Sequence, residues 1–118
     1  VCSNKNVEFT RALLDSLGVA PFFDVVLGPS DVPHPKPAPD MLREALRRLG
    51  VAPAEALYIG DMDVDVQTAR AAGLPVWVVP TGSADRAALR AARPDRLIEG
   101  LGDLAGSLLD TPPRPPLR

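Results

Sequence analysis

Several features that mark large protein classes are scarce in this sequence. Its 118 residues include one cysteine, Cys2, and only 4% aromatic residues. One cysteine cannot form a disulfide within the chain and is typical of a reducing compartment, so we expect a cytoplasmic location. No apolar run approaches the roughly 18 residues that a membrane-spanning helix needs, and no signal peptide is visible. We therefore expect no membrane partner.

A large excess of either charge is also missing. The formal net charge is −2, whereas a nucleic-acid-binding face needs many basic side chains to meet the phosphate backbone. We therefore expect no nucleic-acid partner. Hydrophobic residues (46%) and charged residues (24%) occur in the proportions of an ordinary globular chain. The length is sufficient for one domain with a core.

Strand-like and helix-like patterns alternate along the chain. Apolar residues at helical spacing, each set followed by a glycine, predict helices over 6–17 and 41–49, the second with Asp40 as its cap and Gly50 at its end. A short apolar run between them predicts a buried strand over 22–27. Further along we expect strands over 56–59, 76–79 and 96–98, alternating with helices over 64–72, 85–92 and 103–109.

This alternation predicts an α/β fold, with a parallel sheet and helices on both faces. In such sheets, binding and chemistry gather in the loops beyond the carboxyl ends of the strands. Four polar clusters fall mostly there: SNK at 3–5, PHPKPAPD at 33–40, GDMDVD at 60–65 and PTGS at 80–83. We expect one domain over residues 1–109. The proline-rich tail, 110–118, should be disordered or extended, because proline blocks both helix and sheet ladder.

The acidic cluster offers two carboxylates at a suitable place for a cation. Asp61 directly follows the glycine at the end of a strand, and Asp65 falls in the first turn of the next helix. Their oxygens could hold a hard cation such as Mg²⁺, which takes one or two carboxylates plus water and phosphate. Equally, both could be surface aspartates that favour the start of a helix.

The remaining clusters could bind an anion. Lys36 stands in a loop stiffened by four prolines and could present a point charge to a phosphate, or be simply solvated. Ser3 and Asn4 could bind an anion through a hydroxyl and backbone N–H groups, or only form a turn. His34 has no carboxylate nearby that would suit a catalytic role, so we assign it none.

Taken together and in this order, the clusters resemble the C-terminal part of a haloacid dehalogenase (HAD) superfamily hydrolase of the phosphoglycolate phosphatase-like branch. VCSNK is similar to the second motif of the family, KPAPD matches the third, and YIGDMDVDVQTARAAG matches the fourth, GDxxxD. DRLIEGLGDL resembles the closing strand and helix. The likeness covers roughly residues 1–109. It implies a HAD-like Rossmannoid core and a Mg²⁺-dependent hydrolase, with a small phosphate monoester as substrate.

The resemblance also implies a role for each matched residue. Ser3, with Asn4 beside it, would hydrogen-bond the transferring phosphoryl group, and Lys36 would neutralise that group and the nucleophile. Asp61 would bind Mg²⁺ directly. Asp65 would assist at the metal and orient Lys36 or a metal-bound water.

Two parts of the family pattern are missing from these 118 residues. Members use an aspartate nucleophile, in a DxDxT or DxDxV motif at the end of a first strand, and form an aspartyl-phosphate that water hydrolyses. No such motif precedes VCSN, and the cap domain that selects the substrate is missing too. The place of the first strand, between Cys2 and strand 56–59, should be a slot roughly 10 Å wide. We expect a missing N-terminal half, or another chain, to fill it.

Two other functions stay open from the sequence. One is a non-catalytic binding module derived from a HAD hydrolase, which would keep the site only as a scaffold. The other is a phospho-receiver domain, since a chain of this length with acidic loops would suit one. The order of residues disfavours a receiver, because Lys36 precedes the acidic cluster, whereas a receiver carries its lysine after its aspartates.

Overall fold

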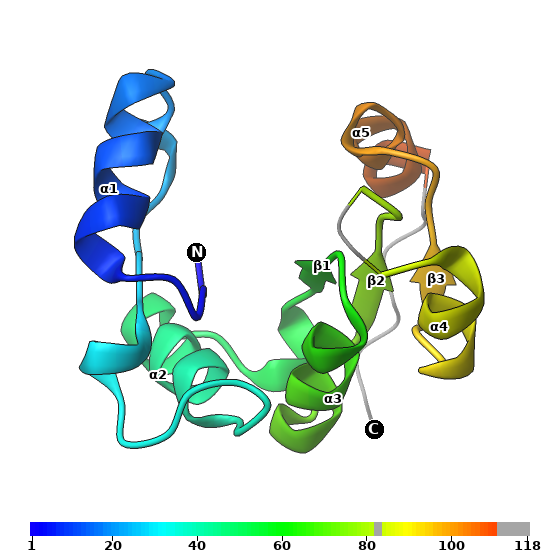
Figure 1. The fold of residues 1–118 in the computed structure, drawn as a ribbon, viewed down its shortest axis with the longest axis horizontal. Helices are drawn as coiled ribbons and strands as arrows, with labels where there is room; N and C mark the ends of the chain where they lie inside the picture. Colours follow the sequence, from blue (N-terminus) through cyan, green and yellow to red (C-terminus); the bar gives the residue numbers. More distant parts are fainter. Residues whose placement is uncertain (82–83, 111–118) are drawn as a thin grey trace.

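The computed structural model describes residues 1–81 and 84–110 (Figure 1). Within these residues the chain forms five α-helices and a three-stranded parallel sheet in the order β1-β2-β3. The helices are α1 (Val7–Ser16), α2 (Asp40–Leu49), α3 (Asp63–Ala72), α4 (Arg86–Ala91) and α5 (Leu101–Asp110). The strands are β1 (Tyr58–Gly60), β2 (Val76–Val78) and β3 (Arg96–Leu97). The expected α/β class with a parallel sheet is therefore confirmed.

Local chemistry sets most of the helix ends. Gly50 and Gly73 adopt left-handed backbone angles, with φ of 69° and 78°, directly after α2 and α3. This conformation is nearly free of cost only for glycine, and it ends a helix. The prediction for Asp40 is wrong, because Asp40 is the first residue of α2 and Pro39 occupies the cap position. The Asp40 carboxylate contacts His34 instead of the backbone at the helix start.

The core lies between the sheet and the helices that pack on one of its faces. Its fully or nearly buried members come from α2, α3, β2 and α4, together with Leu74: Leu42, Leu46, Val66, Ala69, Ala72, Val76, Val78 and Leu89. In the sheet, Tyr58 pairs with Val76 and Gly60 with Val78. This pairing places the carboxyl ends of β1 and β2 side by side, so that the loop after β1 opens at one edge of the sheet.

The predicted strand over 22–27 is wrong. Residues Ala20–Phe22 form a single 3₁₀ turn, and Phe22 is 81% exposed. The N–H groups of Phe22 and Phe23 are bonded locally, to the carbonyls of Val19 and Ala20. The residues that follow pair with residues 1–3: Leu27 forms a parallel bridge with Cys2, and the Val25 carbonyl accepts a hydrogen bond from the Val1 amino group. Phe22 and Phe23 lie outside this pairing, so no strand over 22–27 forms.

The backbones of the Cys2–Leu27 bridge and of β1 do not pair (Figure 1), and a hollow lined by residues of both, including Cys2 and Ile59, lies between them. In a parallel strand, alternate residues present their N–H and C=O groups to opposite neighbours. Tyr58 and Gly60 bond toward β2, so the peptide groups of Ile59 face the hollow. Likewise Ser3 bonds toward Leu27, and Cys2 faces the hollow from the other side. Among the described residues, no strand lies between these two edges.

Two further expectations concern the ends of the chain and the membrane. The proline-rich tail expected over 110–118 lies outside the described residues, except Asp110, which ends α5. None of the described helices is both long and apolar enough to cross a bilayer.

Candidate functional site

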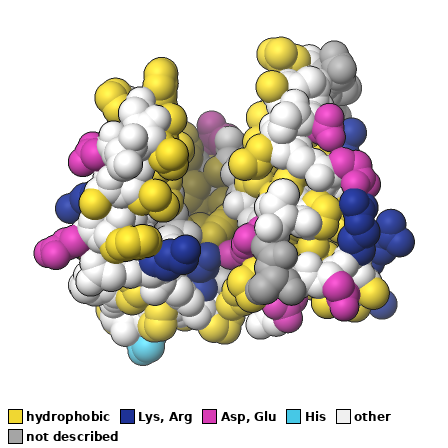
Figure 2. All heavy atoms as spheres, turned by 45° about the horizontal axis from the view of Figure 1, so that its top comes forward, with side chains coloured by type: hydrophobic (Ala, Val, Ile, Leu, Met, Phe, Trp, Pro, Cys, Tyr) yellow, Lys and Arg dark blue, Asp and Glu magenta, His cyan; other side chains and the backbone are white. Residues whose placement is uncertain are grey.

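The upper part of the hollow is a cleft of about 460 Å³ in which polar side chains from distant parts of the sequence meet. We call it the polar cleft; its polar lining includes Ser3, Lys36, Tyr58, Asp61, Asp65 and Thr81. Figure 2 shows the hollow opening between the part of the molecule that carries α1 and the part that carries α5. Four of the five residues singled out in the sequence therefore line one cavity.

Lys36 is held at both its backbone and its side chain. The Asn4 side chain accepts a hydrogen bond from the Lys36 N–H and donates one to the Lys36 carbonyl, both at 3.0 Å. The Lys36 ammonium donates to Asp65 Oδ1 at 2.7 Å, and the two side chains are only 10% and 5% exposed. Asn4 thus contributes its whole amide to the loop of Lys36. It is not among the residues that line the polar cleft.

Asp65 uses both carboxylate oxygens within the protein. Oδ1 accepts from Lys36, while Oδ2 accepts from the backbone N–H groups of Asp61 and Met62 at 3.0 and 3.1 Å. The side chain therefore ties the turn after β1 to the start of α3. A cation and two N–H donors thus satisfy the hydrogen-bonding capacity of this buried carboxylate. This geometry makes Asp65 an anchor for Lys36.

Asp61 and Ser3 are less engaged. Within residues 1–81 and 84–110, no side chain or backbone group hydrogen-bonds the Asp61 carboxylate, which lines the polar cleft half-buried. The Ser3 hydroxyl accepts from the Lys5 N–H at 3.1 Å, which leaves its own proton to donate. The Asp61 carboxylate can therefore bind a cation in the cleft, and the Ser3 hydroxyl can donate a hydrogen bond to a ligand there.

A metal ion would find hard oxygen ligands here, but not a complete protein shell. In the described part of the chain, no three acidic, histidine or cysteine side chains gather as a metal site. Mg²⁺ suits a poorer set, because it keeps several waters and binds through one or two carboxylates plus substrate phosphate. The free carboxylate of Asp61 meets that requirement.

Tyr58 belongs to the same network, and the sequence reading missed it. Its hydroxyl lies 3.1 Å from the Lys36 ammonium, 3.2 Å from the Cys2 carbonyl oxygen and 3.3 Å from Asp65 Oδ1. Burial, and then the neighbouring Asp65 carboxylate, raise the pKa of Tyr58 well above its ordinary value. One signal could have found it: a lone tyrosine in an otherwise aliphatic strand needs a partner for its buried hydroxyl.

His34 has a carboxylate neighbour, contrary to expectation. Its Nδ1 lies 3.1 Å from Asp40 Oδ2, on the exposed side of the loop that carries Lys36. The His34 side chain is 73% exposed and does not line the polar cleft. The sequence hid this contact because the five residues between the partners bend back on themselves through the proline-rich loop.

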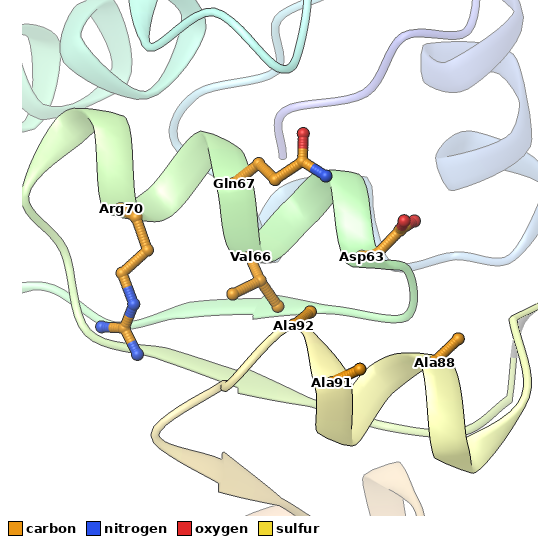
Figure 3. Close-up of a pocket in the computed structure, with 7 residues that line it drawn as sticks. All are labelled: Asp63, Val66, Gln67, Arg70, Ala88, Ala91 and Ala92. Carbon is orange, nitrogen blue, oxygen red and sulfur yellow. The ribbon is translucent and has the colours of Figure 1, made fainter.

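A groove between α3 and α4 is the other pronounced hollow near the acidic turn (Figure 3). Alanines of α4 and Val66 form its apolar floor, and Asp63 and Arg70 lie toward opposite ends. Arg70 is already bound to Asp95 at 3.0 Å and to the Arg93 carbonyl at 2.8 Å. Asp63 lines this groove and is not among the residues that line the polar cleft. The groove has no further cation to pair with an anion, and we do not regard it as the site.

Known proteins resemble the chain in both sequence and structure. A family model described as haloacid dehalogenase-like hydrolase matches residues 1–79. Phosphoglycolate phosphatase of Escherichia coli (strain K12) is 37% identical over 106 residues, which cover 90% of this chain and 42% of the relative. The chain thus spans less than half the length of the curated relatives it matches.

Solved structures agree with this result. A haloacid dehalogenase-like family hydrolase from Streptococcus pneumoniae superposes with a TM-score of 0.80 at 25% identity, over 89% of this chain and 49% of that one. A predicted phosphoglycolate phosphatase from Haemophilus somnus 129pt superposes with a TM-score of 0.85 over 92% of this chain and 48% of that one. At 24% identity, this second likeness shows the fold alone. On the family match, which covers most of its length, the chain belongs to the haloacid dehalogenase-like hydrolases.

Proposed function

We propose that this chain supplies the lysine, serine and metal-binding side of a Mg²⁺-dependent phosphatase that acts on a small phosphate monoester. The observation that carries the proposal is the meeting of Ser3, Lys36, Asp61 and Asp65 in one cleft. A cation, a hydroxyl donor and a free carboxylate are the groups needed to bind a phosphate dianion with a metal ion. The names of the relatives, phosphoglycolate phosphatases, support a small phosphorylated acid as substrate.

Each residue has a distinct task in this proposal. Lys36 neutralises the phosphoryl group, and the Ser3 hydroxyl donates to one of its oxygens. Asn4 holds the Lys36 backbone through two hydrogen bonds of its side-chain amide. Its backbone N–H takes no part in these bonds and would donate to the phosphate. Asp65 keeps the Lys36 ammonium in position at 2.7 Å. Such preorganised charges lower the barrier because they need not reorganise during the reaction.

Asp61 is the residue that would hold Mg²⁺ directly. Asp65 would position it, because the Asp65 carboxylate accepts a hydrogen bond from the Asp61 backbone N–H. When bound, the metal supplies positive charge to a phosphoryl oxygen. This chain contributes to that step by keeping one carboxylate unpaired at the mouth of the polar cleft.

The nucleophile would come from a strand that fills the hollow. An aspartate at the carboxyl end of such a strand would attack phosphorus and release the substrate alcohol. Water would then hydrolyse the resulting aspartyl-phosphate to aspartate and inorganic phosphate. The partner that completes the site is therefore an N-terminal half of the same family, or another chain. The single cysteine supports action in a reducing compartment such as the cytoplasm.

Co-expression with a related N-terminal half tests the proposal. We expect phosphate release from an aryl phosphate that requires Mg²⁺ and is abolished by EDTA. Asp61→Ala should reduce turnover by at least about a hundredfold, because the carboxylate proposed to bind Mg²⁺ directly is lost.

A matched control is Asp63→Ala, which removes a neighbouring carboxylate that faces the α3–α4 groove instead. It should leave turnover within about twofold. Turnover that survives Asp61→Ala, or that persists in EDTA, would overturn the metal assignment. No turnover in the completed unmodified protein would overturn the phosphatase.

A further inference from the structure

The Tyr58 hydroxyl lies at the centre of the contacts that hold Lys36. It belongs to neither KPAPD nor GDMDVD, and it comes from β1, at the floor of the polar cleft. Lys36 Nζ lies 3.1 Å from this hydroxyl and 2.7 Å from Asp65 Oδ1. The same nitrogen lies 5.7 Å from the centroid of the Tyr58 ring, so it sits at the hydroxyl end of the side chain and not over the ring face. The ammonium is therefore held from two sides.

A count of protons shows what each contact does. An ammonium donates three hydrogen bonds and accepts none. Two of the Lys36 protons go to Asp65 and Tyr58. Among residues 1–81 and 84–110, no acceptor takes the third, and Lys36 lines the polar cleft. One N–H is thus left for a ligand.

The phenol proton has two acceptors in reach. The Cys2 carbonyl oxygen lies at 3.2 Å and Asp65 Oδ1 at 3.3 Å. Cys2 faces the hollow, so a strand that entered the hollow would compete for its carbonyl. Asp65 would then remain as acceptor. In the structure, a lone pair of the hydroxyl is turned toward Lys36 whichever of the two acceptors takes the phenol proton.

We infer that Tyr58 is a positioning residue for Lys36: its hydroxyl and Asp65 together fix the ammonium, so that the remaining N–H is presented to the polar cleft. Asp65 alone would leave the ammonium free to rotate about one contact. A second contact at an angle to the first removes that freedom. The inference rests on the proposed function only for the task of the third N–H, which is to meet a phosphoryl oxygen.

Ammonium NMR on the isotope-labelled chain, completed by an unlabelled related N-terminal half, tests the inference without any assay of activity. The 118 residues contain two lysines, Lys5 and Lys36, and Lys5 is exposed. A held ammonium exchanges its protons slowly and gives a proton–nitrogen signal, whereas an exposed one exchanges fast. Lys36→Arg assigns the signal. Tyr58→Phe keeps the ring and removes the hydroxyl, so we expect the Lys36 signal to shift and its exchange to accelerate roughly tenfold or more.

Thr68→Val is the matched control. Thr68 is fully buried, and its hydroxyl donates to the Val64 carbonyl at 2.7 Å within α3. Its loss also removes one buried hydroxyl, but one that is bonded to Val64 and not to Lys36, and should leave the Lys36 signal unchanged. If Tyr58→Phe does not fold, biosynthetic 3-fluorotyrosine decides, because the chain has a single tyrosine. The fluorine weakens the hydroxyl as an acceptor, and the Lys36 signal should shift in the same direction by less.

Turnover of an aryl phosphate in the completed protein adds a second measurement. Tyr58→Phe should lower kcat roughly tenfold while KM changes less than about twofold, because the contact matters most as charge develops. Thr68→Val should change neither. An unmoved Lys36 signal with the modified tyrosine, an unprotected Lys36 signal in the unmodified chain, or an unchanged kcat would overturn the inference. An inactive unmodified protein would overturn the proposed function instead, and the NMR result would still decide this one.

Discussion

At the scale of single residues, the position of the Asp65 side chain requires that residue 60 be a glycine, with no Cβ. A Cβ built at Gly60 would lie 2.3 Å from the Asp65 Cβ and 2.5 Å from its Oδ2. The carboxylate cannot swing away cheaply, because it would leave the N–H groups of Asp61 and Met62 without their acceptor. Glycine is thus required at position 60 because the Asp65 side chain lies close to its Cα. A positive φ is not the reason, since Gly60 does not have one.

Gly60→Ala should therefore destabilise the protein. We expect the free energy of unfolding in urea to fall by about 1–3 kcal/mol through overpacking. In a completed enzyme, phosphatase turnover should fall too, since the Lys36–Asp65 pair is displaced. Gly106→Ala in α5 is the matched control, because no atom lies within 4 Å of its Cβ. It should raise stability by up to about 1 kcal/mol, as alanine favours helix over glycine. Equal losses for both variants would contradict this account.

At the scale of elements, α4 is attached to the core mainly through one side chain. The helix has six residues, of which only Leu89 is buried, at 0% exposure. So short a helix is not stable by itself in water. Its position over the sheet therefore depends on the packing of Leu89 against the apolar side chains of α3 and β2.

Leu89→Ala should cost about 2–5 kcal/mol of unfolding free energy, the usual range for a fully buried leucine. Arg90→Ala, on the exposed side of the same helix, should change it by less than about 0.5 kcal/mol. Urea unfolding of the chain completed by a related N-terminal half, followed by Trp77 fluorescence on β2, measures both variants. A cost below 1 kcal/mol for Leu89→Ala would mean that α4 is held by other contacts, in conflict with this reading.

At the scale of the whole molecule, the hollow divides the sheet. Below the polar cleft it continues as an apolar cavity of about 440 Å³, lined by side chains that include Phe23, Leu46, Leu49 and Ile59. Peptide groups of Cys2 and Ile59 face it from either side. Unpaired strand edges beside exposed apolar surface invite pairing with another chain.

We therefore expect the 118-residue chain alone to bind a hydrophobic dye such as ANS, to aggregate on concentration and to lack a sharp thermal transition. A related N-terminal half should remove the dye binding and produce a cooperative transition, because its strand would pair with both edges. Calorimetry and dye fluorescence measure the two effects. A cooperative transition of the isolated monomer without dye binding would show that the hollow needs no occupant.

Much of this protein is determined by local sequence. Gly50 and Gly73 adopt the left-handed conformation and end α2 and α3, whatever these helices pack against. Short apolar runs with turn residues on both sides give β1 and β2. GDMDVD directly follows β1, so Asp61 and Asp65 lie at the carboxyl edge of the parallel sheet. These features depend on the residue and its near neighbours, so the sequence predicts them.

Only the tertiary structure decided the rest, since it depends on partners distant in the chain. The apolar run at 22–27 did not become a strand, because only residues 25–27 pair with residues 1–3, while the N–H groups of Phe22 and Phe23 bond locally. Whether Asp65 faces a ligand or the protein is decided by Lys36, 29 residues away, and by the backbone of its own turn. The Tyr58 hydroxyl finds its partners across the hollow, up to 56 positions distant. Spacing along a chain does not encode distances of that kind; packing does.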